Sequence, residues 1–277
     1  MNPLLYEDIV RRALLEDMGF QDLTTEAVIS ASSSAAAQFL VKGQGVIAGL
    51  ELAAIAFRLL DPEAKFTAFV QDGDAVETGQ VVASVTGRTR ALLSAERTAL
   101  NLLQRLSGIA SVTRQAVRAA ADFDCQVIDT RKTTPGLRAL EKYAVKVGGG
   151  RNHRFGLFDA VLIKDNHIAA AGSVSKAVNL VRETVGPMVK IEVETESLSQ
   201  VEEALTGGAD VIMLDNMSCP LMQEAVKLIG GRALTEASGG ITLATLREVA
   251  STGVKLISLG WLTHSAPALD ISLDIAD

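Results

Sequence analysis

A chain of 277 residues is long enough to bury a substantial core, as one α/β barrel or as a barrel with a smaller domain. Its 48% hydrophobic and 21% charged residues are typical of a globular protein, and its net charge of −7 excludes a generally basic, polymer-binding surface. No apolar stretch is long enough to span a bilayer, the N-terminus does not read as a signal peptide, and the two cysteines form no metal-type or redox-type pair. We therefore expect a cytoplasmic protein with no membrane or nucleic-acid partner.

The first hundred residues predict a small α+β unit. Apolar residues recur four apart from Pro3 to Glu16, which predicts an amphipathic helix that Gly19 ends. The segment QFLVKGQGVIAG predicts a strand and a glycine turn, and a helix over 51–60 and strands over 65–70 and 80–93 follow. The glycines from Gly43 to Gly49 miss the dinucleotide-binding fingerprint by one position, so we expect no nucleotide site there.

From Ser94 onward the pattern changes to helices and then to alternating elements. Ser107-Gly108 predicts a break between two helices. Short apolar strands follow, each trailed by an amphipathic helix, and such alternation predicts parallel strands with right-handed crossovers. Six such units fit an α/β barrel that lacks two of the usual eight. The expected strands cover 126–128, 160–163, 189–193, 211–214, 233–236 and 255–259.

The stretch from Asp129 to His167 concentrates positive charge. It holds eight Lys/Arg and four acids, a local charge of +4, so the rest of the chain sums to −11. Such an island in an acidic protein indicates a compact anionic ligand. The alternative is a solvated surface, which clustered Lys and Arg commonly form.

Polar residues follow the predicted barrel strands at their C-terminal ends, which is where α/β barrels place their active sites. From Lys164 they recur at steps of 30, 21, 23 and 22 residues, about one strand and helix each. The residues at these ends are Arg131, Lys132, Lys164, Glu194, Asp215, Ser238, Gly239, Gly240 and Gly260.

These residue types suit a phosphorylated and carboxylated ligand. Arginine grips a carboxylate with two parallel hydrogen bonds, and lysine supplies point charge to phosphate. Glu194 and Asp215 can hold sugar hydroxyls, Mg²⁺ or a developing cation. The Ser238–Gly240 turn precedes a helix expected near Thr242, so it either binds an anion or is a plain turn. His153 is either a donor and proton carrier or a structural histidine; His167 and His264 favour structural roles.

Several long motifs together resemble the quinolinate phosphoribosyltransferase family, across essentially the whole chain. They are LLSAERTALNLLQRLSGIAS, DTRKTTPGLRALEKYAVKVGGGRNHRFGL, IKDNHI, EVE, IMLDN, EASGGI and LTHSAPALDISL. Trp261 and Gln21 depart from the family pattern, which favours a smaller residue and a glycine at those positions.

The resemblance implies an N-terminal α/β sandwich domain over 1–108, joined by residues 268–277, and an incomplete six-stranded α/β barrel over 109–267. It implies transfer of phosphoribosyl from phosphoribosyl pyrophosphate to quinolinate with decarboxylation, giving nicotinate mononucleotide, CO₂ and pyrophosphate in NAD biosynthesis. It also implies a Mg²⁺ cofactor, no organic cofactor, and a homodimer with shared active sites that can assemble into a hexamer.

The same resemblance assigns the site residues. Arg131, Arg154 and Lys164 would hold the quinolinate carboxylates, with Thr130 and His153 lining the pocket and Arg97 reaching in from the partner. Lys132 would contact the pyrophosphate. Glu194 and Asp215 would serve the ribose and Mg²⁺, directly or indirectly, and Ser238, Gly239, Gly240 and Gly260 would cradle the 5′-phosphate. Lys132, Lys164, Glu194 and Asp215 are the expected catalytic residues.

Three alternatives stay open at this point. One is a related transferase, as in a molybdenum-transport-associated relative, that acts on a different ring acid or on another anion. The second is a Schiff-base aldolase with Lys164 as the nucleophile. The third is an anion-binding protein without catalytic activity.

Overall fold

The computed structural model describes residues 3–275, whose contacts divide the chain into two units. The first unit comprises residues 3–114, 133–149 and 263–275, and the second comprises residues 115–132 and 150–262. Within the described residues, every helix is too short or too polar to cross a membrane.

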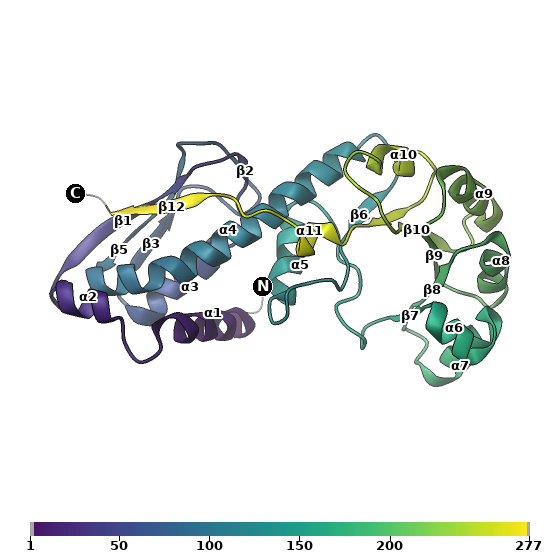
Figure 1. Ribbon diagram of the computed structural model, residues 1–277, viewed down its shortest axis with the longest axis horizontal. Helices are drawn as coiled ribbons and strands as arrows, with labels where there is room; N and C mark the ends of the chain where they lie inside the picture. The colour runs from purple at the N-terminus through teal and green to yellow at the C-terminus, as the bar shows by residue number, and fades with distance from the viewer. Residues whose placement is uncertain (1–2, 276–277) are drawn as a thin grey trace. The chain divides into compact units, whose positions relative to one another are not determined.

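A four-stranded antiparallel sheet forms the centre of the first unit. Its C-terminal strand pairs with β1 so that Phe39 lies opposite Leu273, and Figure 1 shows that strand in yellow beside β1. Two short strands, β2 (Gly45–Val46) and β4 (Ala75–Val76), form a separate pair. The order of the main sheet is β12 (Ile271–Ile275), β1 (Ser34–Val41), β5 (Val81–Arg88) and β3 (Lys65–Ala68).

Helix α3 (Leu50–Leu60) covers this sheet. Its Phe57 ring meets the ring of Phe39 edge-on, with centroids 6.0 Å apart. The Asp72 carboxylate caps the helix, because it accepts hydrogen bonds from the N–H groups of Gly49 and Leu50 at 2.9 and 3.2 Å. Two further helices precede the sheet in sequence, α1 (Pro3–Met18) and α2 (Leu23–Val28). Gly19, with φ 54°, follows α1 and confirms the predicted end of that helix.

The predicted break at Ser107-Gly108 is wrong, because α4 runs unbroken from Thr89 to Ala119. Packing explains both residues. The Ser107 hydroxyl accepts a hydrogen bond from the Ala48 N–H at 3.0 Å. A side chain at Gly108 would collide with the backbone of Pro267 and Ala268, so only glycine lets the C-terminal segment approach the helix.

Helix α5 (Arg138–Val147) packs within the first unit, although the expected division at residue 108 placed it in the barrel. Hydrogen bonds account for this grouping. The Arg105 guanidinium on α4 binds the fully buried Glu141 carboxylate at 2.8 Å, and Tyr143 donates to Asp72 at 2.7 Å.

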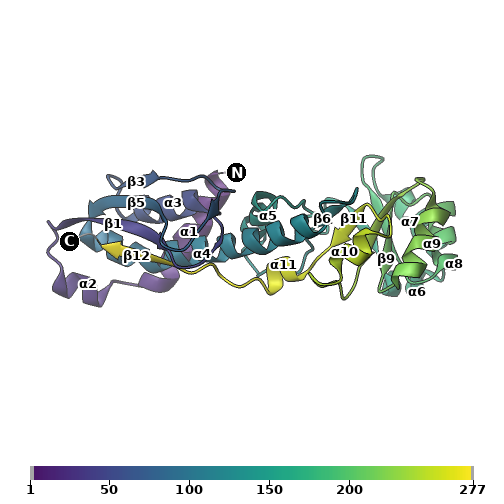
Figure 2. The same cartoon turned by 90° about the horizontal axis from the view of Figure 1, so that it is seen from above.

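The second unit contains a six-stranded, all-parallel sheet. Figures 1 and 2 show helices α7 (Val174–Thr184), α8 (Leu198–Thr206) and α9 (Cys219–Ile229) along one side of it. Each of these helices begins at a serine whose side chain accepts a hydrogen bond from an N–H three residues later. The order of the strands is β6 (Gln126–Ile128), β11 (Leu256–Ser258), β10 (Leu234–Ser238), β9 (Val211–Asp215), β8 (Ile191–Thr195) and β7 (Val161–Ile163).

The predicted α/β class, a sandwich domain with an incomplete six-stranded barrel, is confirmed. Element ends differ in places: residues 89–93 belong to α4 and not to a strand, and β8 begins two residues later than expected. The remaining helices are α6 (Asp165–Ala171), α10 (Leu246–Ala250) and α11 (Trp261–His264).

Candidate active site

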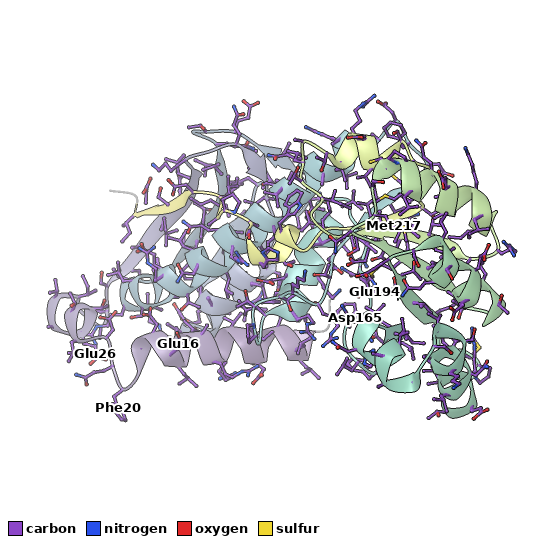
Figure 3. All side chains as sticks on the ribbon, turned by 45° about the vertical axis from the view of Figure 1, so that its right-hand side comes forward. Glu16, Phe20, Glu26, Asp165, Glu194 and Met217 are labelled. Atoms are coloured by element: carbon purple, nitrogen blue, oxygen red, sulfur yellow. The ribbon has the colours of Figure 1, made fainter. Side chains whose placement is uncertain are left out.

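The polar residues chosen from the sequence lie at the C-terminal ends of the parallel strands of the second unit. Ends of parallel strands share one edge of a sheet, so these side chains belong to one region. Figure 3 labels Asp165, Glu194 and Met217 there, at the ends of β7, β8 and β9. The residues are Thr130, Arg131 and Lys132 after β6, Lys164 after β7, Glu194 in β8, Asp215 in β9, Ser238 in β10, and Gly260 after β11.

Arg154 carries a partly desolvated guanidinium that lies within the electrostatic influence of Arg131. Burial lowers the pKa of Arg154, the positive charge of Arg131 lowers it further, and Glu192 and Asp159 oppose the shift. Arg154 Nη1 donates to the Ala160 carbonyl at 2.9 Å, while its buried Nε has no hydrogen-bond acceptor among the described residues. Two neighbouring positive charges, one of them partly desolvated, favour a bound anion, and a guanidinium matches a carboxylate.

Lys164 and Glu194 form an ion pair at the ends of neighbouring strands. Lys164 Nζ lies 3.0 Å from Glu194 Oε2. The lysine side chain is half exposed, whereas the glutamate side chain is 11% exposed. The pair thus presents an ammonium group to a ligand while its carboxylate stays in place.

The Thr130 and Lys132 pair forms a tight turn after β6. Thr130 Oγ1 accepts a hydrogen bond from the Lys132 N–H at 3.0 Å. The turn holds the exposed Lys132 close to the strand end.

Asn216, which sequence reasoning missed, joins the ends of β9 and β10. Its φ of 53° places it in the left-handed region, which non-glycine residues seldom adopt. Its Nδ2 donates to the Asp215 carboxylate at 2.7 Å, and its N–H donates to the Ser238 carbonyl at 2.9 Å. A side chain at Gly239, which has φ 93°, would collide with the Asn216 amide. The position of the Asn216 amide therefore requires glycine at residue 239.

The glycine turn after β10 does not lead directly into a helix. The expected helix near Thr242 is wrong, because α10 begins at Leu246 and residues 242–245 form a turn. Any anion bound here must use the N–H groups of the turn itself. Trp261 Nε1 donates to the Ile241 carbonyl at 2.9 Å, so this departure from the family pattern ties the Gly260 region to the glycine turn.

His153 has both ring nitrogens engaged. Its Nδ1 accepts a hydrogen bond from the Arg154 N–H at 2.7 Å, and its Nε2 lies 2.9 Å from Glu192 Oε2. The His153 N–H in turn donates to the buried Asp129 carboxylate at 2.8 Å. These contacts favour the structural role for His153 over proton transfer.

A pocket of about 460 Å³ includes His153 and Arg154 and reaches the N-terminal ends of several strands. It is lined by His153, Arg154, Glu192 and Glu236, together with residues that begin β6, β7, β9 and β11. Burial raises the pKa of Glu236 well above its usual value, and the charge of Glu192 raises it further. Sequence reasoning missed Glu192 and Glu236, although the spacing of two between Glu192 and Glu194 signals a shared face.

Arg97 belongs to the first unit, on α4, and its side chain is 61% exposed. Its guanidinium lies 3.9 Å from the Glu96 carboxylate.

The strand ends also offer oxygen ligands that suit a hard cation. Asp215 pairs in register with Ser238, and Glu194 pairs with Met213, two residues before Asp215, so both carboxylates face the same side of the sheet. Carboxylate oxygens are what Mg²⁺ prefers, and the donor set therefore fits that ion.

Known proteins resemble this chain along its length. Residues 22–107 match the model of the quinolinate phosphoribosyl transferase N-terminal domain, and residues 109–274 match the model of its C-terminal domain. A probable nicotinate-nucleotide pyrophosphorylase (carboxylating) of Bacillus subtilis is 49% identical over 275 residues, 99% of this chain and 95% of the relative. Quinolinate phosphoribosyltransferase (decarboxylating) 1b of Nicotiana tabacum is 44% identical over 96% of this chain and 81% of its own. The solved structure of NadC from Streptococcus pyogenes superposes with a TM-score of 0.96 at 45% identity, covering 100% of this chain and 99% of its own.

Proposed function

The chain belongs to the quinolinate phosphoribosyltransferase family, and from that membership we propose how its own residues carry out the family reaction. The enzyme transfers the phosphoribosyl group of phosphoribosyl pyrophosphate to quinolinate. It releases CO₂ and pyrophosphate and forms nicotinate mononucleotide, a step in the biosynthesis of NAD.

In this proposal, Arg131, Arg154 and Lys164 hold the two carboxylates of quinolinate, and Thr130 and His153 line the pocket. The observation that carries it is the desolvated Arg154, with a buried Nε that meets no acceptor in residues 3–275 and a pKa lowered by burial and by Arg131. A doubly negative ring acid supplies the missing acceptor and offsets both charges. Lys164 can turn from Glu194 to a carboxylate because its side chain is half exposed.

The phosphoribosyl end is proposed for the neighbouring strand ends. Lys132 faces the pyrophosphate, Glu194 and Asp215 serve the ribose, and the N–H groups of a glycine cradle hold the 5′-phosphate. Mg²⁺, held by Glu194 and Asp215 directly or through water, would supply positive charge to the leaving pyrophosphate. The residues proposed for the cradle are Ser238, Gly239, Gly240 and Gly260.

The proposed roles of these charged residues follow from the charges that develop on the substrates as bonds form and break. The pyridine nitrogen attacks C1 of the ribose as the bond from C1 to pyrophosphate breaks, and C1 passes through an oxocarbenium-like state that nearby carboxylates stabilise. The ring then carries a positive nitrogen. The bond from C2 to its carboxylate breaks next, CO₂ leaves, and the electron pair that remains on C2 takes up a proton. Lys132, Lys164, Glu194 and Asp215 act by position and charge.

A homodimer with shared active sites, extendable to a hexamer, is also proposed, with Arg97 entering the partner's site. Exposed apolar side chains on the first unit support the proposal that a partner subunit covers this surface. Phe20, between α1 and α2 and labelled in Figure 3, is fully exposed, and Leu15 and Leu23 are 62% and 71% exposed. A cytoplasmic location is proposed from the bacterial relative, whereas some plant relatives carry mitochondrial or chloroplastic in their names.

The Schiff-base alternative receives no support from the site. A nucleophilic lysine is usually set in an apolar pocket or beside another cation, whereas Lys164 lies 3.0 Å from the Glu194 carboxylate.

The test of the carboxylate clamp is Arg154→Ala. We expect kcat/KM for quinolinate to fall at least about a thousandfold, because a charged, bidentate contact is lost in a desolvated site. Circular dichroism and the melting temperature report whether the fold is intact, and Arg182→Ala, on the exposed face of α7, is the control. Near-normal turnover of folded Arg154→Ala would remove the clamp from the proposal.

A further inference from the structure

A largely buried cluster of His153, Glu192 and Glu236 adjoins Arg154 of the proposed carboxylate clamp. His153 Nε2 is 2.9 Å from Glu192 Oε2 and 3.6 Å from Glu236 Oε2. The two glutamates are 5% and 1% exposed. One oxygen of each glutamate, Oε1, is buried without a hydrogen-bond partner in the described chain. Burying two carboxyl groups without full hydrogen bonding costs free energy, so such a pair usually has a functional or structural role.

The three side chains have the ligand atoms of a metal site, within 4.8 Å of one another. The imidazole argues against a metal. Its Nδ1 accepts the Arg154 N–H, so a neutral ring must carry its proton on Nε2. A protonated Nε2 has no lone pair for a cation, and it points instead at Glu192 as a hydrogen-bond donor.

The same imidazole ring also fixes the position of the Arg154 backbone. Asp129 accepts hydrogen bonds from the His153 N–H at 2.8 Å and from Asn152 Nδ2 at 2.6 Å, which fixes the backbone on one side. On the other side, His153 Nδ1 accepts the Arg154 N–H, so the orientation of the ring sets the peptide from which the guanidinium extends. Ala160 holds the far end of the Arg154 side chain.

We propose that Glu192 and Glu236 are positioning residues for quinolinate: Glu192 holds the His153 ring through Nε2–H, and the ring holds the backbone of Arg154 in place. The proposal deepens the proposed function and rests on it. Neither glutamate needs to touch the substrate.

Glu236 supports Glu192 in this arrangement. It faces Glu192 and Ser258, and its buried carboxyl group stays protonated more readily than an ordinary glutamate, because burial and the Glu192 charge raise its pKa. A neutral Glu236 can donate a hydrogen bond to Glu192, and Glu192 Oε2 lies 2.9 Å from His153 Nε2, where it can accept the Nε2–H. The charge of Glu192 also favours the cationic form of the desolvated Arg154.

The test compares Glu192→Ala with Glu192→Gln in the full-length enzyme. In the alanine variant the Nε2–H of His153 loses its acceptor, and we expect KM for quinolinate to rise about tenfold or more while KM for phosphoribosyl pyrophosphate changes less than about twofold. In the glutamine variant an amide oxygen accepts from Nε2–H, so KM for quinolinate returns to within about threefold of wild type. Glu202→Ala, an exposed acid on α8, is the matched control.

Calorimetric titration of quinolinate into the same proteins, with melting temperatures, keeps the test independent of catalysis. A merely structural role lowers the melting temperature and the active fraction but leaves the affinity of the folded protein unchanged. Unchanged quinolinate affinity in folded Glu192→Ala would overturn the inference, as would an equal rise in both KM values. No turnover by wild type would contradict the proposed reaction instead, and the titration would still decide on Glu192.

Discussion

At the scale of single residues, the strand ends hold paired groups more often than isolated charges. Lys164 is paired with Glu194 and Asp215 with Asn216 at the strand ends, and His153 is paired with Glu192 within the sheet. The charged partners that end strands were predictable, because they recur once per strand and helix along the sequence. The supporting residues were harder to predict: only the spacing of two from Glu194 indicates Glu192, and Asn216 depends on a backbone conformation that residue type alone does not indicate.

Asn216→Ala tests the support of the phosphoribosyl end. The Asp215 carboxylate loses a charge-assisted hydrogen bond, so we expect kcat/KM for phosphoribosyl pyrophosphate to fall about tenfold while KM for quinolinate stays near wild type. Asn216→Gly lacks the same amide but tolerates φ 53°, so it should be more stable than Asn216→Ala by about 1 kcal/mol and equally impaired. Full activity in Asn216→Gly would show that only the backbone matters there.

At the scale of elements, hydrophobic periodicity predicted most helices and strands. Local composition gave wrong predictions where tertiary packing determines the structure. Ser107-Gly108 has the composition of a helix break, yet it lies inside the 31-residue α4 because Ala48 and the segment around Pro267 pack against it. Likewise, the motif from Thr133 to Gly149 seemed part of the barrel, and hydrogen bonds to Arg105 and Asp72 place it with the first unit.

Gly108→Ala tests this account of α4. In an exposed helix interior, alanine is more stable than glycine by about 1 kcal/mol. At position 108, however, the alanine methyl group would collide with the Pro267 backbone. We expect a net loss of about 2 kcal/mol in the free energy of unfolding, measured by urea denaturation. Gly186→Ala, in an open loop where no atom lies within 4 Å of an added methyl, should change stability by less than about 0.5 kcal/mol. A Gly108→Ala protein as stable as wild type would show that close approach of the Pro267 segment does not require glycine at this position.

At the scale of the whole molecule, the alternation of strands and helices was enough to predict a parallel six-stranded barrel, and the structure confirms it. Assembly was not predictable from periodicity, because association depends on exposed surface. The proposed sharing of sites between subunits has a direct consequence for mixed dimers.

Arg97→Ala and Arg154→Ala should complement each other. If Arg97 enters the partner's site, each variant alone is inactive, and a mixed dimer has one site that carries both substitutions and one that carries neither. Random reassembly of equal amounts should restore about a quarter of wild-type activity, because half of the dimers are mixed and each has one intact site. Activity that stays at the level of the separate variants after verified subunit exchange would place Arg97 in its own subunit's site or outside the site.

The central claim is that the strand ends of the second unit bring a ring dicarboxylate and an activated ribose together. The most direct measurement supplies wild-type protein with quinolinate labelled in its 2-carboxylate, Mg²⁺ and phosphoribosyl pyrophosphate, and follows labelled CO₂ and pyrophosphate. We predict that both products appear in equal amounts, only when both substrates are present, and that Arg154→Ala abolishes both. Release of pyrophosphate without CO₂, or no reaction with quinolinate at all, would contradict the account.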